Sequence, residues 1–276
     1  MPDDNSESSD PEDILSASLQ TLYDYAPITH SSGGDSFTYK NTFATSQSTV
    51  TLRTPDPKAA NWSLHASSIW VSSLYVADHL GGLQLDRLRS SGSQDGGPHI
   101  LELGAAAGLP GIVIAQAYPS LRVTVSDYPD EDLISALSDN VTANDVANRC
   151  RVVPYAWGSD CSVFAPEASF DMILACDTLW NPDLHTLFIK TLCDLLKRSD
   201  DARIHLVAGL HTGRFTLQAF MLAVRAAGLK ILIAVEKEVV GETQREWSAE
   251  REDSEQERRR WVVWMILSWP CESIEN

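Results

Sequence analysis

The sequence predicts an α/β fold in which helices cover both faces of a doubly wound, mostly parallel sheet. Three observations support this prediction: short apolar strands alternate with helices, a turn of small residues joins one strand to the next helix, and the last two strands follow each other without an apolar helix between them. Alternation predicts parallel strands covered on both faces. Directly consecutive strands indicate an antiparallel pair, which is expected at the C-terminal end.

The alternating segment follows the polar stretch Arg89–Pro98, which predicts a loop. Strands are expected over His99–Leu103, Arg122–Ser126, Arg151–Tyr155, Phe170–Cys176 and Arg203–Ala208. Helices are expected over Pro110–Ala117, Asp130–Ala143, Pro182–Leu196 and Thr216–Ala227. Lys230–Val235 and Trp261–Trp269 are the two terminal strands, and the charged residues between Glu242 and Arg260 favour a solvated helix with paired charges.

An N-terminal extension precedes this segment. Met1–Leu15 is acidic and polar, so it predicts a disordered tail. Ser36–Lys40 and Ser48–Arg53 are β-prone and predict a hairpin that caps the main domain. Ile69–Leu80 has apolar residues at helical spacing, and the glycines at 81 and 82 supply a stop. The expected organisation is a tail (1–15), a hairpin and helix cap (16–98) and one large domain (99–276).

Composition limits the class of function. The 276 residues, of which 43% are hydrophobic, can bury a large core. A net charge of -17 argues against nucleic-acid binding, because such affinity comes from Lys and Arg, and it suits a basic partner. The five scattered cysteines lack a C-x-x-C pair and predict neither disulfides nor a metal site. No signal peptide or membrane span is expected, which favours a location in the cytoplasm or the nucleus.

The strongest motif is HILELGAAAGLPG, from His99 to Gly111, in which a buried strand runs through a small-residue turn into a helix. Small side chains let a ligand approach the backbone. The helix N-terminus adds unpaired N–H groups that suit a carboxylate or a phosphate. About 20 residues further on, Asp127 ends the next strand, where an acid reaches ribose hydroxyls in folds of this kind.

Two details separate this motif from a dinucleotide-binding loop. A dinucleotide-binding loop carries a second glycine between its first and last ones, whereas only alanines lie between Gly104 and Gly108. In addition, Glu102 lies within the strand end. The segment resembles the first motif of class I methyltransferases. This resemblance implies a Rossmann-like sheet of seven strands with an antiparallel C-terminal strand, and S-adenosylmethionine as cofactor. Ala106 occupies a position where many members carry glycine, and we expect it to avoid a positive φ.

Further stretches resemble fungal seven-strand methyltransferases that are described as nicotinamide N-methyltransferase-like and are similar to the enzymes that methylate translation elongation factor 1-alpha. These stretches are Ser68–Trp70, Glu102–Pro110, Ser126–Asp130, Tyr155–Gly158, Ala175–Trp180 and Gly209–Arg214. The resemblance implies a cofactor site formed by Trp70, Glu102, Gly104, Ala105, Ala106, Gly108, Asp127, Tyr128, Trp157 and Cys176. Burial of Trp70 and Trp157 as plain core is the alternative.

The candidate catalytic residues follow the fourth predicted strand. Related lysine methyltransferases carry Asp-x-x-Tyr there, whereas this chain has Asp177 and, in place of the tyrosine, Trp180. An aromatic wall can hold an amine by cation–π attraction, but a tryptophan lacks the phenol's hydrogen bond. Asp177 has two possible roles: it orients or deprotonates an amine, or it caps the next helix. His211 and Arg214 are weaker candidates, and Arg214 has the alternative of pairing with nearby acids.

These features favour an S-adenosylmethionine-dependent N-methyltransferase that modifies a lysine or N-terminal amine of a basic protein, such as a translation elongation factor. Two alternatives stay open: transfer to a small nicotinamide-like or other amine metabolite, and a binding protein that keeps the fold without catalysis. A nicotinamide-dependent oxidoreductase is disfavoured because the sequence contains no Tyr-x-x-x-Lys pair or other residue pattern typical of a hydride-transfer site. The acceptor, the number of methyl groups added and the oligomeric state also stay open.

Overall fold

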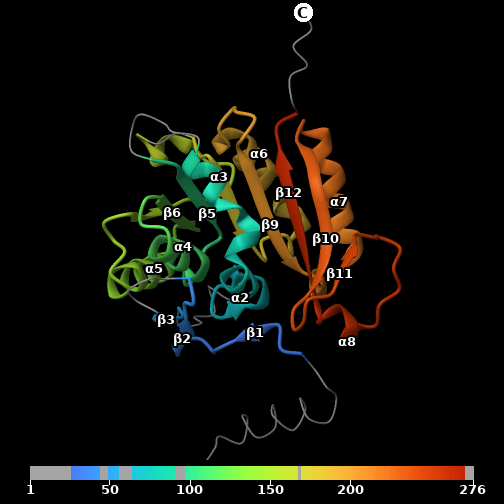
Figure 1. Ribbon diagram of the computed structural model, residues 1–276, viewed down its shortest axis with the longest axis horizontal. Coiled ribbons are helices and arrows are strands. Elements are labelled where there is room, and N and C mark those ends of the chain that lie inside the picture. Colours follow the sequence, from blue (N-terminus) through green and yellow to red (C-terminus); the bar gives the residue numbers. More distant parts are fainter. Residues whose placement is uncertain (1–25, 44–48, 56–63, 91–96, 167–168, 271–276) are drawn as a thin grey trace, which may run out of the picture.

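The computed structural model describes residues 26–43, 49–55, 64–90, 97–166 and 169–270. An eight-stranded sheet lies at its centre, with the strand order β11-β10-β12-β9-β8-β5-β6-β7 (Figure 1). The strands are β5 (His99–Leu103), β6 (Arg122–Asp127), β7 (Cys150–Pro154), β8 (Met172–Cys176), β9 (Arg203–Gly209), β10 (Lys230–Glu238), β11 (Gln244–Glu246) and β12 (Trp261–Ser268). Strands β5 to β9 are parallel. Strand β12 is antiparallel to β9 and β10, as predicted.

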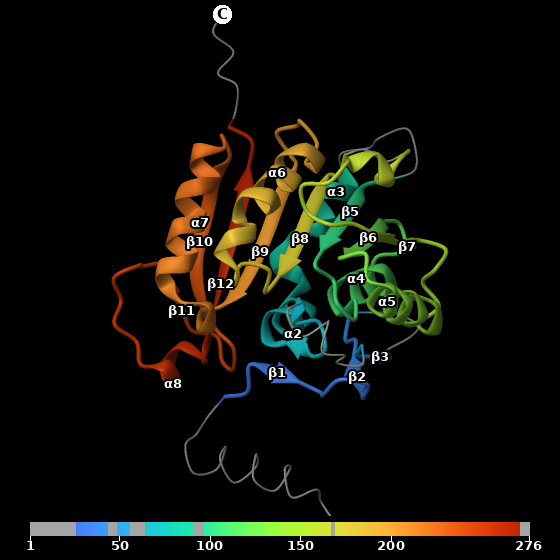
Figure 2. The same cartoon turned by 180° about the vertical axis from the view of Figure 1, so that it is seen from behind.

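Helices cover both faces of this sheet (Figures 1 and 2). The α-helices are α2 (Val71–Asp78), α3 (Leu85–Ser90), α4 (Leu109–Ala117), α5 (Glu131–Ala143), α6 (His185–Leu195), α7 (Arg214–Ala226) and α8 (Glu255–Arg258). Short 3-10 helices are η2 (Leu80–Leu83), η3 (Cys161–Phe164), η4 (Pro182–Leu184) and η5 (Leu210–Thr212). The predicted α/β class is confirmed, and the short strand β11 is the one strand of the central sheet that the sequence did not predict.

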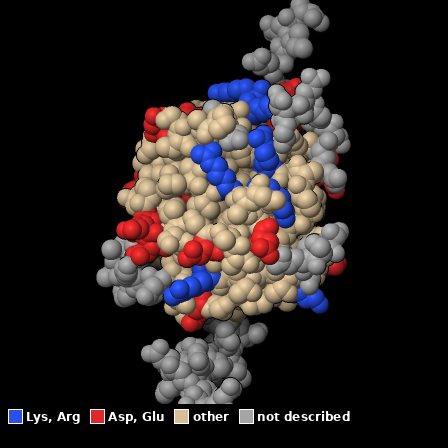
Figure 3. Space-filling view, turned by 90° about the vertical axis from the view of Figure 1, so that its left-hand side faces the viewer, with Lys and Arg blue, Asp and Glu red and all other residues tan. Residues whose placement is uncertain are grey.

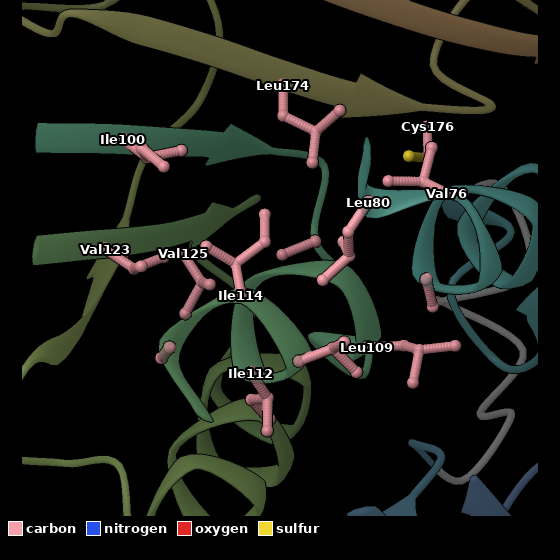
Figure 4. Close-up of a cluster of buried hydrophobic side chains, with 14 of the residues drawn as sticks. Val76, Leu80, Ile100, Leu109, Ile112, Ile114, Val123, Val125, Leu174 and Cys176 are labelled. Atoms are coloured by element: carbon pink, nitrogen blue, oxygen red, sulfur yellow. The ribbon is translucent and has the colours of Figure 1, made fainter. Parts of the chain in front are cut away.

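Alternate residues of each strand face the two layers, because successive side chains of a strand point to opposite faces. Ile100 belongs to one buried cluster together with residues of α2 and α4, whereas Leu101 belongs to a second cluster with residues of α6 and α7. Figure 4 shows Ile100, Val123 and other strand residues of the first cluster directed toward the side chains of α4 and α2. The core therefore lies in two layers, one on each side of the sheet.

The predicted N-terminal hairpin is confirmed as β2 (Ser36–Lys40) and β3 (Thr49–Arg53), which pair antiparallel. Its residues Tyr39, Val50 and Leu52 are buried in the same cluster as Ile100, so the hairpin packs onto the main core. The predicted tail, Met1–Leu15, lies outside the described residues. The predicted loop Arg89–Pro98 begins inside α3, and its residues 91–96 also lie outside the described part.

The helix predicted over Ile69–Leu80 begins two residues later than expected. Ile69 and Trp70 form the short strand β4, which pairs antiparallel with β1 (Thr29–His30), and this pairing holds Trp70 in an extended conformation. The helix ends at Asp78, before the glycines that were expected to stop it, and Gly81 and Gly82 lie within the following 3-10 helix η2. A Cβ at Gly82 would lie 2.7 Å from the Trp264 ring, so close packing explains this glycine.

The solvated helix predicted between Glu242 and Arg260 is wrong for most of that segment. Only Glu255–Arg258 is helical, and Gln244–Glu246 forms a strand beside β10. Arg245 and Arg251 pair with Glu236 of β10, and each approaches its carboxylate to 2.7 Å. The predicted pairing within a helix occurs only at the short α8, where Arg259 pairs with Glu255 over 3.1 Å. None of the helices in the described part of the chain has the length and apolar character needed to cross a membrane.

Candidate active site

A cavity of about 470 Å³ opens at the carboxyl ends of β5, β6 and β8. The chain crosses from β5 to β6 in one direction and from β8 to β9 in the other, so the cavity lies where the strand order reverses. Ligands of open α/β sheets bind at this type of switch point. The lining residues are Leu64, His65, Ala66, Ser68, Ile69, Trp70, Ser73, Gly104, Ala105, Ala106, Ala107, Leu109, Asp127, Tyr128, Tyr155, Ala156, Trp157, Cys176, Asp177, Thr178, Trp180, Asn181, Leu184 and Leu187.

Residues 104–108, here called the cradle loop, join β5 to α4 below this cavity. Gly104, Ala106 and Gly108 have φ angles of 69°, 47° and 84°. The expectation that Ala106 avoids a positive φ is therefore wrong. Its backbone N–H donates to Oδ2 of Asp127 over 2.7 Å. A left-handed non-glycine residue costs about 1–2 kcal/mol, and a charge-assisted hydrogen bond can offset this cost.

Gly104 keeps the cavity open at the end of β5. A Cβ at this position would lie 2.7 Å from Cγ2 of Thr178 and 3.6 Å from the Trp157 ring. The backbone of Gly104 therefore reaches the cavity only because it carries no side chain.

Asp127 ends β6 with its carboxylate turned toward the cradle loop. Besides the bond to Ala106, its Oδ1 accepts the N–H of Tyr128 over 2.6 Å. Burial raises the pKa of Asp127 to about 6, against the lowering effect of these two backbone hydrogen bonds. Asp127 lines the cavity, and Tyr128 lies at its mouth with half of its surface exposed.

Glu102 and Gly108, two of the residues expected to bind the cofactor, do not line the cavity. Oε2 of the buried Glu102 accepts the N–H of Gly111, in the first turn of α4, over 2.8 Å. Burial raises the pKa of Glu102 to about 8, and the nearby charge of Asp127 adds to this effect while the Gly111 bond opposes it. Glu102 therefore ties the strand end to the helix start.

Trp157 and Cys176 form further parts of the cavity wall. Trp157 also packs against Phe188 of α6, with ring centroids 4.5 Å apart, so it lines the cavity and contributes to the core at the same time. Cys176 is buried, and burial raises the pKa of its thiol well above the usual range. A thiol with a raised pKa stays protonated at neutral pH and acts as an apolar wall.

Asp177 is fixed between two elements that are far apart in the sequence. Its Oδ1 accepts the N–H of Gly209, the last residue of β9, over 2.6 Å, and its Oδ2 accepts the N–H of Ser72, in α2, over 3.3 Å. The helix-capping role considered for Asp177 is wrong, because the side chain of Asn181 caps η4 instead. Asp177 itself has a left-handed backbone with a φ of 52°.

Aromatic rings surround the cavity next to Asp177. Trp180 makes an edge contact with His65, with ring centroids 4.5 Å apart. Nε1 of Trp70 donates to the backbone oxygen of His65 over 2.7 Å, and the Trp70 ring stacks on His211 at 5.3 Å. Nothing in the sequence around His65 indicated this position, because no motif surrounds it and its neighbours come from distant segments.

The two weaker candidates do not line the cavity. His211 lies against Trp70, where burial lowers its pKa and the charge of Asp177 opposes this effect. Arg214 is buried and pairs with Glu236 and Asp253, which matches the alternative of pairing with nearby acids.

The sheet order, the cradle loop at the strand-order reversal and the acid at the end of β6 together define a Rossmann-like methyltransferase fold. The chain belongs to the lysine methyltransferase family, whose family model matches residues 59–223.

Named relatives agree with this family. The protein N-terminal and lysine N-methyltransferase efm7 of Emericella nidulans is 32% identical over 157 residues, which are 50% of this chain and 56% of that protein. The protein of the same name from Schizosaccharomyces pombe is 34% identical over 137 residues, 47% of this chain and 50% of its own. The chain thus spans about half the length of the curated relatives it matches. The solved structure of the cyclase SpnF shares the fold, with a TM-score of 0.50 and 17% identity over 70% of this chain and 81% of that one.

Proposed function

We propose that this protein is an S-adenosylmethionine-dependent N-methyltransferase that modifies a lysine side chain or an N-terminal amine of a protein. One observation carries the proposal: a single cavity joins the cradle loop and Asp127 at one side to the fixed Asp177 and its aromatic neighbours at the other. Membership of the lysine methyltransferase family supports the same reaction.

The residues of the cradle loop fit the cofactor. Gly104, Ala105, Ala106 and Ala107 line the cavity with at most a methyl side chain each, so a ligand can approach the backbone of this loop closely. The carboxylate of Asp127 is the acceptor for ribose hydroxyls. Trp70 and Trp157 offer aromatic faces from two walls of the cavity. When bound, S-adenosylmethionine supplies a methyl group on a positively charged sulfur.

The protein's own contribution is to position the acceptor nitrogen and to keep water away from it. An amine attacks only in its neutral form. A wall that excludes water favours this form through desolvation, against the cation–π attraction that aromatic rings offer an ammonium. Trp70 and Trp180 form such a wall beside Asp177. The carboxylate of Asp177, held by two backbone N–H groups, is rigid enough to accept a hydrogen bond from the amine and to orient its lone pair.

A basic protein region is the proposed acceptor. The relatives are named for protein N-terminal and lysine methylation, and the sequence resembles enzymes that act on translation elongation factor 1-alpha. The net charge of -17 favours association with a basic surface. On the face shown in Figure 3, Lys and Arg gather mainly in the upper half, and Asp and Glu lie mostly around the middle.

The proposal is tested by incubating the full chain with isotope-labelled S-adenosylmethionine and either purified elongation factor 1-alpha from a fungus, a fungal lysate or nicotinamide. We expect label on a lysine or N-terminal amine of a protein, located by mass spectrometry. Label on nicotinamide alone would move the assignment to small amines. Calorimetry with S-adenosylhomocysteine tests the third alternative, a protein that keeps the fold without catalysis. A chain that shows no binding would lack methyltransferase activity.

An Asp177→Asn variant tests the acceptor side of the cavity. Asparagine tolerates a left-handed backbone, and its Oδ1 can still accept the N–H of Gly209. Its Nδ2 cannot accept the longer bond from Ser72, so we expect the fold to persist with some loss of stability. Loss of the carboxylate should lower kcat by about 100-fold, within the range for groups that assist proton transfer or orient the acceptor, with the cofactor affinity unchanged. Asp183→Asn is the control, since this exposed residue of η4 does not line the cavity. Equal kcat values for the two variants would exclude a role for Asp177.

A further inference from the structure

The N-terminal hairpin is attached to the core by two asparagines of α5. Oδ1 of Asn144 accepts the N–H of Thr51 over 3.0 Å, and its Nδ2 donates to the oxygen of the same residue over 2.8 Å. Asn140 makes the same pair of bonds to Arg53, over 2.8 Å and 3.0 Å. The two side chains therefore bind the free edge of β3 in the way that a neighbouring strand would.

This arrangement follows from matching spacings in a helix and a strand. Residues four apart on a helix are separated by about 6 Å along its axis, and residues two apart on a strand by about 6.7 Å. Asn140 and Asn144 can therefore reach Arg53 and Thr51 at the same time. Both asparagines are buried, with exposed fractions of 3% and 2%, so their hydrogen-bonding groups have little access to water. Breaking these bonds would leave polar groups without a partner.

Asn140 makes one contact that Asn144 does not. Its Nδ2 also donates to the backbone oxygen of Ala107 over 3.0 Å. Ala107 lies in the cradle loop between Ala106 and Gly108, both of which have a positive φ. The corresponding donor of Asn144 goes to the backbone oxygen of Asn140, within the same helix. One amide group thus joins the hairpin, α5 and the cradle loop.

We propose that Asn140 is a positioning residue for the cradle loop and couples docking of the N-terminal hairpin to binding of the cofactor. The hairpin fixes the amide of Asn140 through Arg53, and the fixed amide holds the oxygen of Ala107. Asp127 holds the same loop from the other side at Ala106. The family match begins at residue 59, so the hairpin lies outside the matched residues. The cofactor part of this inference rests on the proposed function.

The test compares Asn140→Ala with Asn144→Ala, because each variant removes an equivalent pair of bonds to β3, at Arg53 and at Thr51 respectively. Calorimetry with S-adenosylhomocysteine should give a Kd at least about fivefold higher for Asn140→Ala. Asn144→Ala should raise Kd less, because it loosens the hairpin but keeps the bond from Asn140 to Ala107. Hydrogen exchange without cofactor should be faster over residues 104–108 in Asn140→Ala only.

The reciprocal effect is a further expectation, because coupling between two sites acts in both directions. S-adenosylhomocysteine should slow hydrogen exchange of residues 49–53 in the wild type more than in Asn140→Ala. Equal affinities and equal exchange over residues 104–108 in the two alanine variants would overturn the proposal. A wild-type chain that does not bind S-adenosylhomocysteine would contradict the proposed function instead, and the exchange comparison would still decide whether Asn140 holds the loop.

Discussion

At the scale of single residues, the cradle loop combines three left-handed backbone positions that are stabilised in different ways. Gly104 and Gly108 have no Cβ and adopt a positive φ at little cost. Ala106 pays this cost and is held by the carboxylate of Asp127. The loop therefore depends on a side chain from the neighbouring strand, which makes its shape sensitive to substitutions at position 127 as well as within the loop.

Replacing Gly104 with alanine should close the cavity and destabilise the fold. The new Cβ would lie 2.7 Å from Cγ2 of Thr178 at a φ of 69°. Gly228→Ala is the control, because its φ is 88° and a Cβ there would meet nothing within 4 Å. We expect the control to lose about 1 kcal/mol from backbone strain alone. Gly104→Ala should lose more and should not bind S-adenosylhomocysteine, as measured by urea unfolding and calorimetry.

The buried Glu102 should make stability depend on pH. Burial raises its folded-state pKa to about 8, above the value of 4.5 for an unperturbed glutamate. Its contribution to stability is therefore fully present below pH 4.5 and is lost as the pH rises to 8, with a slope of up to about 1.4 kcal/mol per pH unit. A Glu102→Gln variant should lack this slope. Urea unfolding of both proteins between pH 5 and 9 measures the difference, and parallel curves would contradict the prediction.

At the scale of elements, the connection from β10 to β12 is held to the molecule by charge. Glu236 in β10 forms ion pairs with Arg214, Arg245 and Arg251. Asp253 forms ion pairs with Arg214 and Arg245. Burial by itself would raise the pKa values of the two acids, but their arginine partners lower both below the usual range. A connection with little apolar surface can pack against α7 and β10 by this means.

Removing Arg214 should therefore be costly. Its side chain and those of Glu236 and Asp253 have exposed fractions of 6%, 0% and 6%, so Arg214→Ala leaves buried carboxylates with fewer partners. Loss of one partner of a buried pair typically costs about 3–5 kcal/mol. Arg260→Ala removes a pair with Glu238 in which the arginine is 58% exposed, and it should cost less than about 1 kcal/mol. Equal urea midpoints for the two variants would contradict this account.

At the scale of the whole molecule, the cavity joins segments that are spread between residues 64 and 187 of the chain. Its walls come from residues 64–73 ahead of the sheet, from the carboxyl ends of β5 to β8 and from the loop before α6. A ligand that contacts all of these segments binds only the folded chain. Binding should therefore stabilise the entire molecule and not one loop alone.

Adding S-adenosylhomocysteine should raise the unfolding midpoint in thermal scans. At a ligand concentration of 100 times Kd, the expected stabilisation is about 2.7 kcal/mol. NADH is the control, because the cradle loop lacks the second glycine of a dinucleotide loop. A midpoint raised by NADH and unchanged by S-adenosylhomocysteine would assign the cavity to a different cofactor.

Much of the fold was predictable because each element carries its own local pattern. The runs of buried residues that form β5 to β9 begin and end within two residues of the predicted limits. The C-terminal antiparallel pair followed from the absence of an apolar helix between two strands. Most of the predicted site residues line the cavity, because strand ends of a parallel sheet meet at one edge. His65 could not be predicted, since its contact with Trp180 depends on how distant segments pack.

By itself, the sequence determined the α/β class, the position of the cradle loop and the acid that follows it, because periodicity and small-residue turns are local properties of the chain. Only the tertiary structure decided the conformation of Ala106, the strand character of Ile69 and Trp70, and the charge pairing of residues 242–260. Each of these depends on a partner far away in the sequence: Asp127, β1 and Glu236, respectively. Such contacts have no local pattern, so they become visible only when the elements are packed together.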